Sequence, residues 1–401
     1  MNFYLTEEQK MIQQLTRKFA SDKVRPLSEK IDATGDVPSS LIEEIAGLGL
    51  MGITTPEEYG GGGMDTVCYV IAMEEIASAC ASTSTIVTVN NSLVCEPIFR
   101  YGTEEQKRRF LTHLAKGEIL GCFALTEAGA GSDVPAIKTS AVKENKEGLS
   151  NNPLTPFVKG EGDGYILNGS KLFVSNGKRA QVVIVFAVTD ASKGHRGISA
   201  FIVEKKTPGL SIGRVEEKLG IKGSETVELI FERCRIPKEN LLGQEGDGFK
   251  IAMNTLDMGR IGIAAQSVGI AQACLDEATK YSVKRVQFGK PIAQLQAIQF
   301  MIADMAMEIE AARLLTYRAA YMKDKGLKFV KEASMAKLYA SETANKCAYR
   351  ALQIHGGYGY TKDFPLERYY RDARVTTLYE GTSEIQRLTI AKELLKEQKP
   401  D

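Results

Sequence analysis

The apolar residues of this chain change their spacing twice, and this change restricts the fold more than any other feature of the sequence. Residues 1 to about 120 carry apolar side chains at the 3.6-residue period of helices. From 121 to 237 the apolar runs are short, β-branched and separated by turns such as Asn176-Gly177, which is typical of strands. The helical period returns over 238–401. The sequence therefore predicts a mainly α protein with a middle β domain, a barrel or sandwich, and domains at 1–120, 121–237 and 238–401.

Individual elements can be placed within these segments. Thr6 begins a helix-capping pattern, and a helix is predicted over 67–81 with Glu74 and Glu75 on its polar side. The strongest strand is predicted over 182–188, where every residue is apolar and most are β-branched. One long bundle helix is predicted from six apolar residues spaced three and four apart: Leu295, Ile298, Ile302, Met305, Ile309 and Ala312.

Composition excludes several classes of function. The 401 residues include 51 basic and 50 acidic side chains, so no basic excess favours nucleic acid or anionic lipid. No apolar run approaches the length of a membrane span. The seven cysteines form no CxxC pattern, and three scattered histidines do not indicate a metal site. The N-terminus lacks an export pattern, so we expect a cytoplasmic protein, or a mitochondrial matrix protein if a leader has been removed.

Two short motifs match well-known patterns but lie in the wrong context. Residues 47–52 match G-x-G-x-x-G, but a predicted helix precedes them, whereas a dinucleotide site needs a strand there. Residues 209–213 match G-x-S-x-G, but they lie between predicted strands, and a nucleophile elbow needs a helix directly after the serine. We therefore interpret both as ordinary turns or strand segments.

Four other stretches carry residues suited to binding or catalysis. Residues 123–133 run from a strand into a loop of small residues, whose free N–H groups can hold a phosphate or a heteroaromatic edge. Residues 285–291 offer cationic, amide and aromatic groups after a helix, and residues 353–360 are rich in glycine. Near the C-terminus, Glu380 stands between a tyrosine and a glycine. An apolar neighbour can desolvate this carboxylate and raise its pKa, as a base acting on a carbon acid requires.

Together these stretches resemble the acyl-CoA dehydrogenase family, in the order of that family's motifs and over nearly the whole chain. Residues 123–133 resemble the first family signature. Three further segments resemble the second signature: 353–359, 368–372 and 379–387. Similarity to the short-chain, or butyryl-CoA, branch is found at 90–93, 101–107 and 256–261.

The resemblance implies an N-terminal helical domain, a middle β domain and a C-terminal four-helix bundle, assembled as a homotetramer with non-covalent FAD. It implies that electrons pass to an electron-transferring flavoprotein. Residues implied to line the flavin and pyrophosphate are Phe123, Leu125, Thr126, Gly131, Ser132, Phe173 and Ser175. Residues implied at the adenosine end, partly from a neighbouring subunit, are Arg285, Gln287, Phe288 and Gln296, completed by Gln353, Gly356, Gly357, Thr382 and Glu384. Position 173 is often tryptophan in the family, so phenylalanine keeps the ring but loses the N–H donor.

The resemblance also implies the chemistry. Glu380 would take the proton next to the thioester carbonyl while hydride leaves the next carbon, and its backbone N–H would bind the thioester oxygen. Some branches carry the base at the position of Gly259, which leaves Glu380 without a rival here. Asp257, Arg260 and Ser132 would contact the CoA portion, although a surface ion pair is the alternative for Arg260. Tyr379 and Gly381 would shape the thioester pocket.

Two alternatives and one departure remain open at this stage. The same residues could run the reverse reaction, as an enoyl-CoA or aryl-acrylyl-CoA reductase. A flavin-free acyl-CoA-binding scaffold is disfavoured because a scaffold needs neither Glu380 nor the glycine loops. Residues 145–161 look like an insertion into the β domain, either a tolerated surface loop or a contact for substrate or partner.

Overall fold

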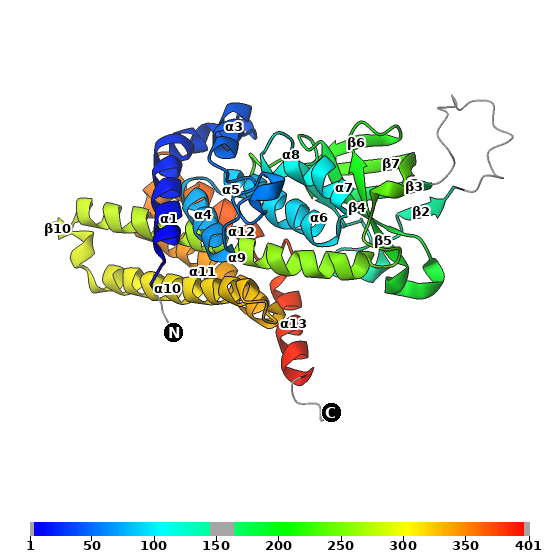
Figure 1. Cartoon of the computed structure of the whole chain (residues 1–401). Helices are drawn as coiled ribbons and strands as arrows, with labels where there is room; N and C mark the ends of the chain where they lie inside the picture. The colour runs from blue at the N-terminus through cyan, green and yellow to red at the C-terminus, as the bar shows by residue number, and fades with distance from the viewer. Residues whose placement is uncertain (1–3, 145–163, 397–401) are drawn as a thin grey trace.

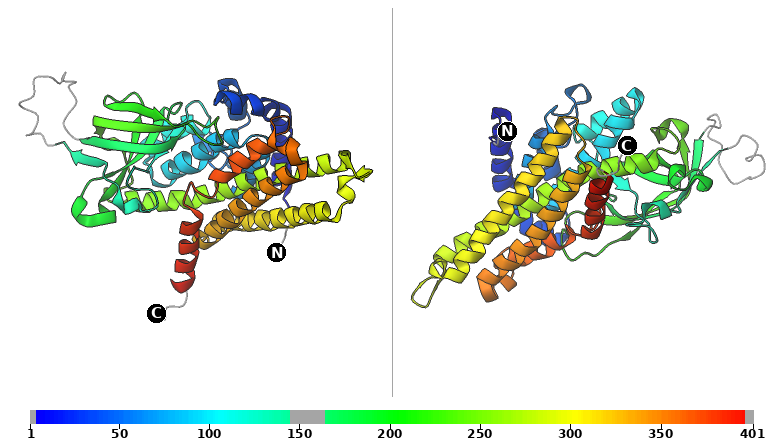
Figure 2. Two further views of the ribbon diagram at one scale, coloured as in Figure 1. Left: turned by 180° about the vertical axis from the view of Figure 1, so that it is seen from behind. Right: turned by 90° about the horizontal axis from the view of Figure 1, so that it is seen from below.

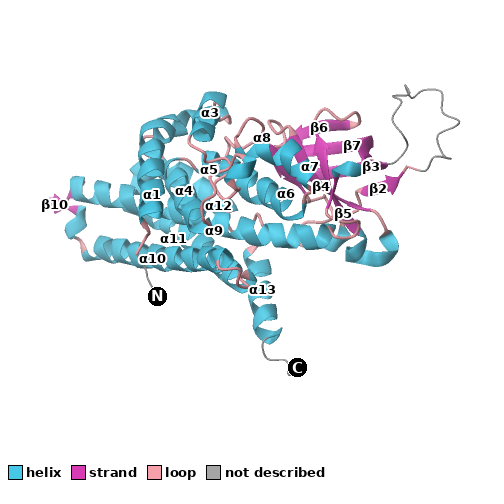
Figure 3. Ribbon diagram, in the orientation of Figure 1, coloured by secondary structure: helices cyan, strands magenta, loops and turns pink. Residues whose placement is uncertain are grey.

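The computed structural model describes residues 4–144 and 164–396, and Figures 1 and 3 show helices at both ends of the chain with a sheet between them. The first helices are α1 (Glu7–Phe19), α2 (Ser28–Thr34), α3 (Ser39–Gly47), α4 (Thr66–Ala79), α5 (Ala81–Thr88), α6 (Glu96–Tyr101), α7 (Glu104–Gln106) and α8 (Thr112–Ala115). The sheet contains β1 (Gly121–Ala124), β2 (Ser140–Lys143), β3 (Gly164–Ser175), β4 (Val182–Val188), β5 (Ile198–Glu204), β6 (Leu210–Val215), β7 (Thr226–Pro237) and β8 (Leu241–Leu242).

The helical period then returns, and the prediction of a mainly α protein with a middle β domain is confirmed. The last part of the chain forms α9 (Gly248–Lys284), a hairpin of β9 (Val286–Gln287) and β10 (Lys290–Pro291), α10 (Gln296–Asp324), α11 (Val330–His355), α12 (Leu366–Val375) and α13 (Ser383–Lys396). The insertion predicted near 145–161 lies outside the described residues. Within the described ranges, no helix combines the length and apolar character that a membrane crossing requires.

Helix α4 differs from its prediction. Glu74 and Glu75 were expected on a polar face, but both are only 8% exposed. Helices α1, α9 and α10 all pack against α4, so it is buried on every side. The two carboxylates are accommodated because Arg313 pairs with Glu74 and Arg17 pairs with Glu75. The two glutamates of this helix therefore belong to buried ion pairs, and not to a solvent-exposed face as predicted.

The sheet is buried on both sides at its centre. Its strand order is β6-β7-β3-β2-β4-β5-β8. Strand β1 lies outside this order and pairs in parallel with β4. Alternate residues of β4 point into different cores: Val182, Ile184 and Phe186 face a cluster shared with helices, whereas Val183 and Val185 face a cluster between strands. A strand covered on both faces reads as a continuous apolar run, which explains the pattern of 182–188. The motif at 209–213 falls in β6, so it forms no nucleophile elbow.

Helix α9 connects the two parts of the molecule. Figures 1 and 2 show it running from beneath the sheet to the opposite end of the helical body, where the β9–β10 hairpin lies. It packs against α4, α10 and α11, and these helices share one core. The predicted apolar stripe of α10 belongs to that core or packs against it, as expected. Residues from α9, α11 and the segment after α12 can therefore meet at one place.

Two buried asparagines connect neighbouring segments, and one of them, Asn90, fastens the start of the sheet to the first helices. They lie in a π-helical segment, Val89–Cys95, and are at most 2% exposed. The Asn90 amide donates to the carbonyls of Met51 (2.9 Å) and Leu114 (3.0 Å), and its oxygen accepts from the Gly121 N–H (3.1 Å). One side chain thus joins three segments, and the last of them begins β1, which leads into the loop at 125–132.

We expect Asn90→Leu to lower the free energy of unfolding by at least about 3 kcal/mol, because three buried backbone groups lose their partner and each unsatisfied group costs about 1–3 kcal/mol. The measurement is the melting temperature together with flavin content after purification. Asn168→Leu is the control, because Asn168 accepts one exposed hydrogen bond from the Arg233 N–H. Equal melting temperatures for the two variants would contradict this account of Asn90.

Candidate active site

Glu380 lies in a tight turn between α12 and α13, and the turn fixes the direction of its carboxylate. Glu380 has φ of 51° and Gly381 has φ of 93°, so two consecutive residues adopt the left-handed conformation. A non-glycine residue rarely adopts it, so the surroundings must hold the turn. They do so through the Gly381 carbonyl, which accepts from Lys337 Nζ (2.7 Å) and Gln386 Nε2 (2.9 Å).

The carboxylate points at helix α9, where a glycine makes room for it. A Cβ atom built at Gly259 would lie 2.0 Å from Glu380 Oε2 and 3.0 Å from the Leu93 side chain. Oε2 itself is buried and has no hydrogen-bond partner among the described residues. Those residues also offer no acceptor to the Glu380 backbone N–H. The turn thus presents an unpaired carboxylate oxygen and a free N–H donor.

Burial sets the basicity of this carboxylate. Desolvation raises the pKa of Glu380 to about 7, while the positive charges of Lys337 and Arg260 act in the opposite direction. A carboxylate with a pKa near 7 is ionised in part at neutral pH and remains a useful base there. The structure therefore has a carboxylate with a pKa near neutrality at the position where the sequence predicts a base.

An ion pair joins Asp257 to Arg260, which lies one turn further along helix α9. Arg260 Nη1 lies 2.5 Å from Asp257 Oδ1, and both residues are 6% exposed. The alternative of a surface ion pair for Arg260 is therefore wrong, because the pair is buried. Arg260 Nε has no partner in the described structure, and burial raises the pKa of Asp257 to about 6. An unsatisfied buried donor beside a partly protonated acid is the kind of group that a polar ligand satisfies.

Tyr379 is anchored on the other side of the turn. Its hydroxyl donates to Gln266 Oε1, and Gln266 Nε2 donates to Thr85 Oγ1 (2.7 Å) and to the Ala81 carbonyl (2.9 Å). This chain of hydrogen bonds connects the turn to α9 and α5. The tyrosine next to Glu380 is thereby held in place.

The loop after β1 is held by a buried ion pair. Lys171 is fully buried, and its ammonium donates to Glu127 (2.6 Å) and to the Leu125 carbonyl (3.1 Å). The Glu127 carboxylate also accepts from the N–H groups of Lys138 and Thr139. The backbone before and after the loop is therefore fixed, while Gly131 and Ser132 between them are exposed.

The predicted flavin residues of the middle domain surround this loop. Phe123 packs against Phe186, Leu125 is buried, and the Thr126 carbonyl accepts from the Leu172 N–H (2.8 Å). Phe173 has φ of 55° at a bulge where β3 slips against β7, and this turns its ring outward to 62% exposure. Ser175 follows in the same strand and is partly buried. An exposed aromatic ring beside an open glycine loop can cover one face of a planar ligand.

A second group of predicted residues lines a cavity of about 510 Å³ at the far end of α9. It includes Arg285 and Gln287 from the hairpin and Gly356 and Gly357 from the end of α11. The Arg285 guanidinium lies 5.4 Å from the centre of the Tyr358 ring. Cβ atoms built at Gly356 and Gly357 would meet nothing within 4 Å, so the backbone there is open to a ligand.

Other predicted residues are not brought to this cavity within one chain. Phe288, at the tip of the hairpin, is 89% exposed, and Gln296 and Gln353 are also exposed. Thr382 and Glu384 lie at the start of α13, next to the Glu380 turn rather than beside the hairpin. Figure 1 shows the hairpin and α13 at separate places on the molecule. The predicted adenosine site is therefore divided into two parts in the single chain.

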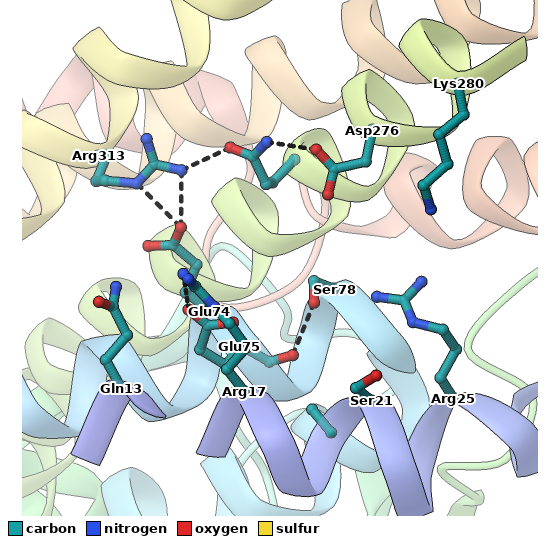
Figure 4. A pocket seen from close by; sticks show the side chains of 12 residues that line it. Gln13, Arg17, Ser21, Arg25, Glu74, Glu75, Ser78, Asp276, Lys280 and Arg313 are labelled. Atoms are coloured by element: carbon teal, nitrogen blue, oxygen red, sulfur yellow. Dashed lines mark hydrogen bonds and ion pairs between the residues drawn. The ribbon is translucent and has the colours of Figure 1, made fainter. Parts of the chain in front are cut away.

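The molecule has a larger cavity, of about 780 Å³, between α1, α4, α9 and α10, but its charged groups largely satisfy one another. Figure 4 shows Arg17 bound to Glu75, and Arg313 bound to Glu74. Arg313 also donates to Gln272. None of the residues predicted for the site lines this cavity. It offers mutually neutralised ion pairs instead of an unpaired reactive group, so we do not assign the chemistry to it.

Sequence reasoning missed the groups that support the Glu380 turn. Lys337 on α11 belongs to no stretch that the sequence singled out. Gln386 on α13 lies within the predicted segment 379–387 but was given no role there, although it also binds the turn. A signal for Lys337 did exist, because Ala333, Ala336 and Ala340 place small residues around it on one helix face. Those alanines are fully buried, and a lysine on their face is buried with them. The sequence gives no comparable signal that Lys171 is buried. Bulges in β3 shift the alternation of inward-facing and outward-facing residues, so this alternation does not predict the burial of Lys171.

Comparison with known proteins agrees with this geometry. Models of the acyl-CoA dehydrogenase N-terminal, middle and C-terminal domains match residues 6–118, 122–234 and 246–395. The human mitochondrial short-chain specific acyl-CoA dehydrogenase is 50% identical over 98% of this chain and 91% of its own length. The acryloyl-CoA reductase (NADH) of Anaerotignum propionicum is 50% identical over 99% of this chain and 96% of its own.

Solved structures agree as well. The butyryl-CoA dehydrogenase of Megasphaera elsdenii superposes with a TM-score of 0.93 at 45% identity, covering 98% of this chain and all of that one. Three domain models in order, together with relatives this similar, show more than a shared fold. The chain belongs to the acyl-CoA dehydrogenase family of flavin-dependent oxidoreductases, as its sequence predicted.

Proposed function

We propose that this protein oxidises short- or medium-chain acyl-CoA thioesters to trans-2-enoyl-CoA, with Glu380 as the base that removes the α-proton. The observation that carries the proposal is the Glu380 carboxylate, held in a left-handed turn with an unpaired oxygen against Gly259. A structural glutamate would be paired, as Glu74 and Glu127 are. An unpaired, desolvated carboxylate is unfavourable unless a ligand uses it.

The residues of the turn perform two tasks in this reaction. Glu380 takes a proton from the carbon next to the thioester carbonyl, so the carboxylate becomes a carboxylic acid. The free Glu380 N–H donates to the thioester oxygen, where negative charge develops as the proton leaves. Tyr379 and Gly381 border the thioester. The buried Arg260, with one nitrogen unpartnered beside Asp257, and the exposed Ser132 are positioned for polar groups of the CoA portion.

The residues around β1 fit FAD. The open backbone at Gly131 and Ser132, and the outward ring of Phe173, form an exposed surface beside a loop that Lys171 and Glu127 hold rigid. Bound FAD supplies the acceptor for the hydride that leaves the β-carbon. Phe123, Leu125, Thr126 and Ser175 would hold the flavin and pyrophosphate from the middle domain. For the adenosine end we retain Arg285, Gln287, Phe288, Gln296, Gln353, Gly356, Gly357, Thr382 and Glu384 as the proposed residues.

Packing beyond the turn supports a short acyl group. One helical turn after Gly259, a Cβ atom built at Gly262 would lie 2.4 Å from the Tyr69 hydroxyl. Helices α4 and α9 are therefore in direct contact there, which leaves little room for a long chain. The name of the human relative, a short-chain specific enzyme, agrees with this substrate class.

A second candidate function is the reverse reaction, reduction of a short enoyl-CoA. It is favoured by the acryloyl-CoA reductase (NADH), which matches this chain as closely as the human dehydrogenase does. The geometry of Glu380 serves both directions, because a base that removes the α-proton can return it. In either direction we propose an electron-transferring flavoprotein as the electron partner and a homotetramer as the assembly.

The first test is the visible spectrum of the purified protein during anaerobic titration with butyryl-CoA. We expect a yellow flavoprotein whose absorbance bleaches as the substrate is oxidised. Glu380→Gln should stay yellow but bleach about 10²–10⁴-fold more slowly, the usual contribution of a general base. Bleaching of Glu380→Gln at the wild-type rate would refute the role of Glu380. Reoxidation of the chemically reduced wild-type flavin by crotonyl-CoA that is faster than its reduction by butyryl-CoA would favour the reductase.

The raised pKa of Glu380 also predicts a pH-dependent effect on stability. A carboxyl group with a pKa near 7 when folded and near 4.5 when unfolded destabilises the fold once it ionises. This destabilisation is absent below about pH 4.5 and complete above about pH 7. We expect Glu380→Gln, which cannot ionise, to melt progressively higher than wild type as pH rises from 5 to 8. A melting difference that is constant across this range would contradict the assignment.

Gly259→Ala tests the fit between α9 and the carboxylate. The new methyl group would overlap Glu380 Oε2, and a flexible carboxylate can move aside at little cost to stability. We expect a melting temperature near that of wild type and flavin reduction slowed by about 10²-fold, as misplacement of a reacting group by about 1 Å can cause. Gly47→Ala is the control, because a Cβ atom there meets nothing within 4 Å. Equal rates for both variants would show that Glu380 does not need this space.

A further inference from the structure

Lys337 is a buried cation that forms no contact ion pair with a carboxylate of the described residues. Of the described lysines, only Lys171 and Lys337 are fully buried. Lys171 is neutralised by Glu127 at 2.6 Å, which is the usual arrangement for a buried charge. No carboxylate of the described residues lies within ion-pair distance of the Lys337 ammonium. Since an unpaired buried charge is strongly unfavourable, a group that faces Lys337 must account for its presence.

The hydrogen bond of Lys337 leads directly to the Glu380 turn. Its ammonium donates to the Gly381 carbonyl at 2.7 Å, immediately after the candidate base. Gln386 donates to the same carbonyl at 2.9 Å and to the Glu380 carbonyl at 3.2 Å. The left-handed turn is therefore held by two donors, of which one is neutral and the other is charged. Both are buried, so neither exchanges easily with water.

The charged groups around this point come from several elements. Lys337, on α11, faces Glu380, Arg260 of α9, Glu342 of its own helix and Glu384 of α13. Glu380 in turn faces Lys337 and Arg260, and it raises the pKa of the phenols of Tyr69, on α4, and Tyr379. Both phenols are neutral near pH 7, so Lys337 and Arg260 are the cations that act on the Glu380 carboxylate.

We propose that Lys337 is a positioning residue of the active site, whose ammonium holds the Glu380–Gly381 turn and whose positive charge keeps the Glu380 carboxylate ionised. This inference rests on the proposed role of Glu380 as the base. Burial makes the carboxylate basic but also favours its protonated form, which cannot accept a proton. A cation behind the turn offsets that effect without touching the substrate. Lys337 thus acts through Glu380 and is not itself a catalytic residue.

Lys337→Met provides the main test, because methionine fills similar space without a charge or a donor. We expect the pH midpoint for flavin reduction by butyryl-CoA to rise by about 1–3 units, the range produced by loss of a nearby opposite charge. The rate at pH 7 should fall at least about tenfold and recover in part toward pH 9. Loss of structure alone would lower the rate at every pH without moving the midpoint.

Three further variants separate charge from geometry. Gln386→Leu removes the neutral donor from the same carbonyl, so we expect a lower rate with an unchanged midpoint. Lys337→Arg retains the cation and should keep the wild-type midpoint. Lys323→Met removes another largely buried lysine, on α10, whose ammonium lies 3.4 Å from Glu96 of α6, and should keep the midpoint because Lys323 is not among the charges that act on Glu380. Lys337→Gln replaces Lys337→Met if the latter does not fold with bound flavin.

A readout without turnover separates this inference from the proposed function. The ionisation of Glu380 can be followed by infrared difference spectra between each protein and its Glu380→Gln counterpart over a pH series. A Glu380 midpoint that rises on Lys337→Met supports the inference even if no acyl-CoA bleaches the wild-type flavin, a result that would refute the proposed function alone. A midpoint that stays in place in Lys337→Met, or that rises equally in Lys337→Arg, overturns the inference whatever the activity.

Discussion

Helix α9 can approach its neighbours as closely as it does only because one of its faces lacks side chains at three positions. Gly259 admits the Glu380 carboxylate, Gly262 admits the Tyr69 hydroxyl, and Gly269 lies against the backbone of α4 at Glu74. These glycines lie within three turns of the same helix, so each turn contacts a different part of the molecule. A methyl group at Gly262 or Gly269 would push α9 away from α4, and one at Gly259 would displace the Glu380 carboxylate. The candidate active site therefore depends on the same contacts that join the two helical parts of the chain.

Two buried lysines carry the same charge but have different structural roles. Lys171 meets Glu127 directly, and the pair fixes the loop after β1, where neither charge remains available to a ligand. Lys337 meets a carbonyl, and the carboxylate that balances it electrostatically, Glu380, keeps a free oxygen. Burial lowers the pKa of both ammonium groups to about 8. The difference lies in the partner: a contact ion pair gives rigidity, whereas a separated pair leaves a reactive base.

The sequence was sufficient to predict the order of helices and strands and to single out Glu380 as a candidate, because both depend on local patterns. The period of the apolar residues located α10 and β4, and the motif order identified the family. The burial of charged residues where helices meet was harder to predict from the sequence. Glu74 and Glu75 looked like surface residues because their partners, Arg313 and Arg17, come from helices that are distant in sequence. For the same reason the sequence did not predict that Arg260 is buried. Nor did it predict that Lys337 and Gln386 support the turn.

The separation of the predicted cofactor residues has a direct geometric meaning. Arg285 lies 26 residues beyond Gly259 along α9, which corresponds to about 39 Å of straight helix. One extended FAD molecule cannot reach from the Glu380 turn to the hairpin of the same chain over that distance. The hairpin nevertheless carries an exposed phenylalanine and borders a cavity to which Arg285 contributes a cation. Such a surface is explained if it serves the cofactor of a neighbouring copy, so that each proposed flavin site needs two chains. The proposed homotetramer would then be a requirement of cofactor binding as well as a form of assembly.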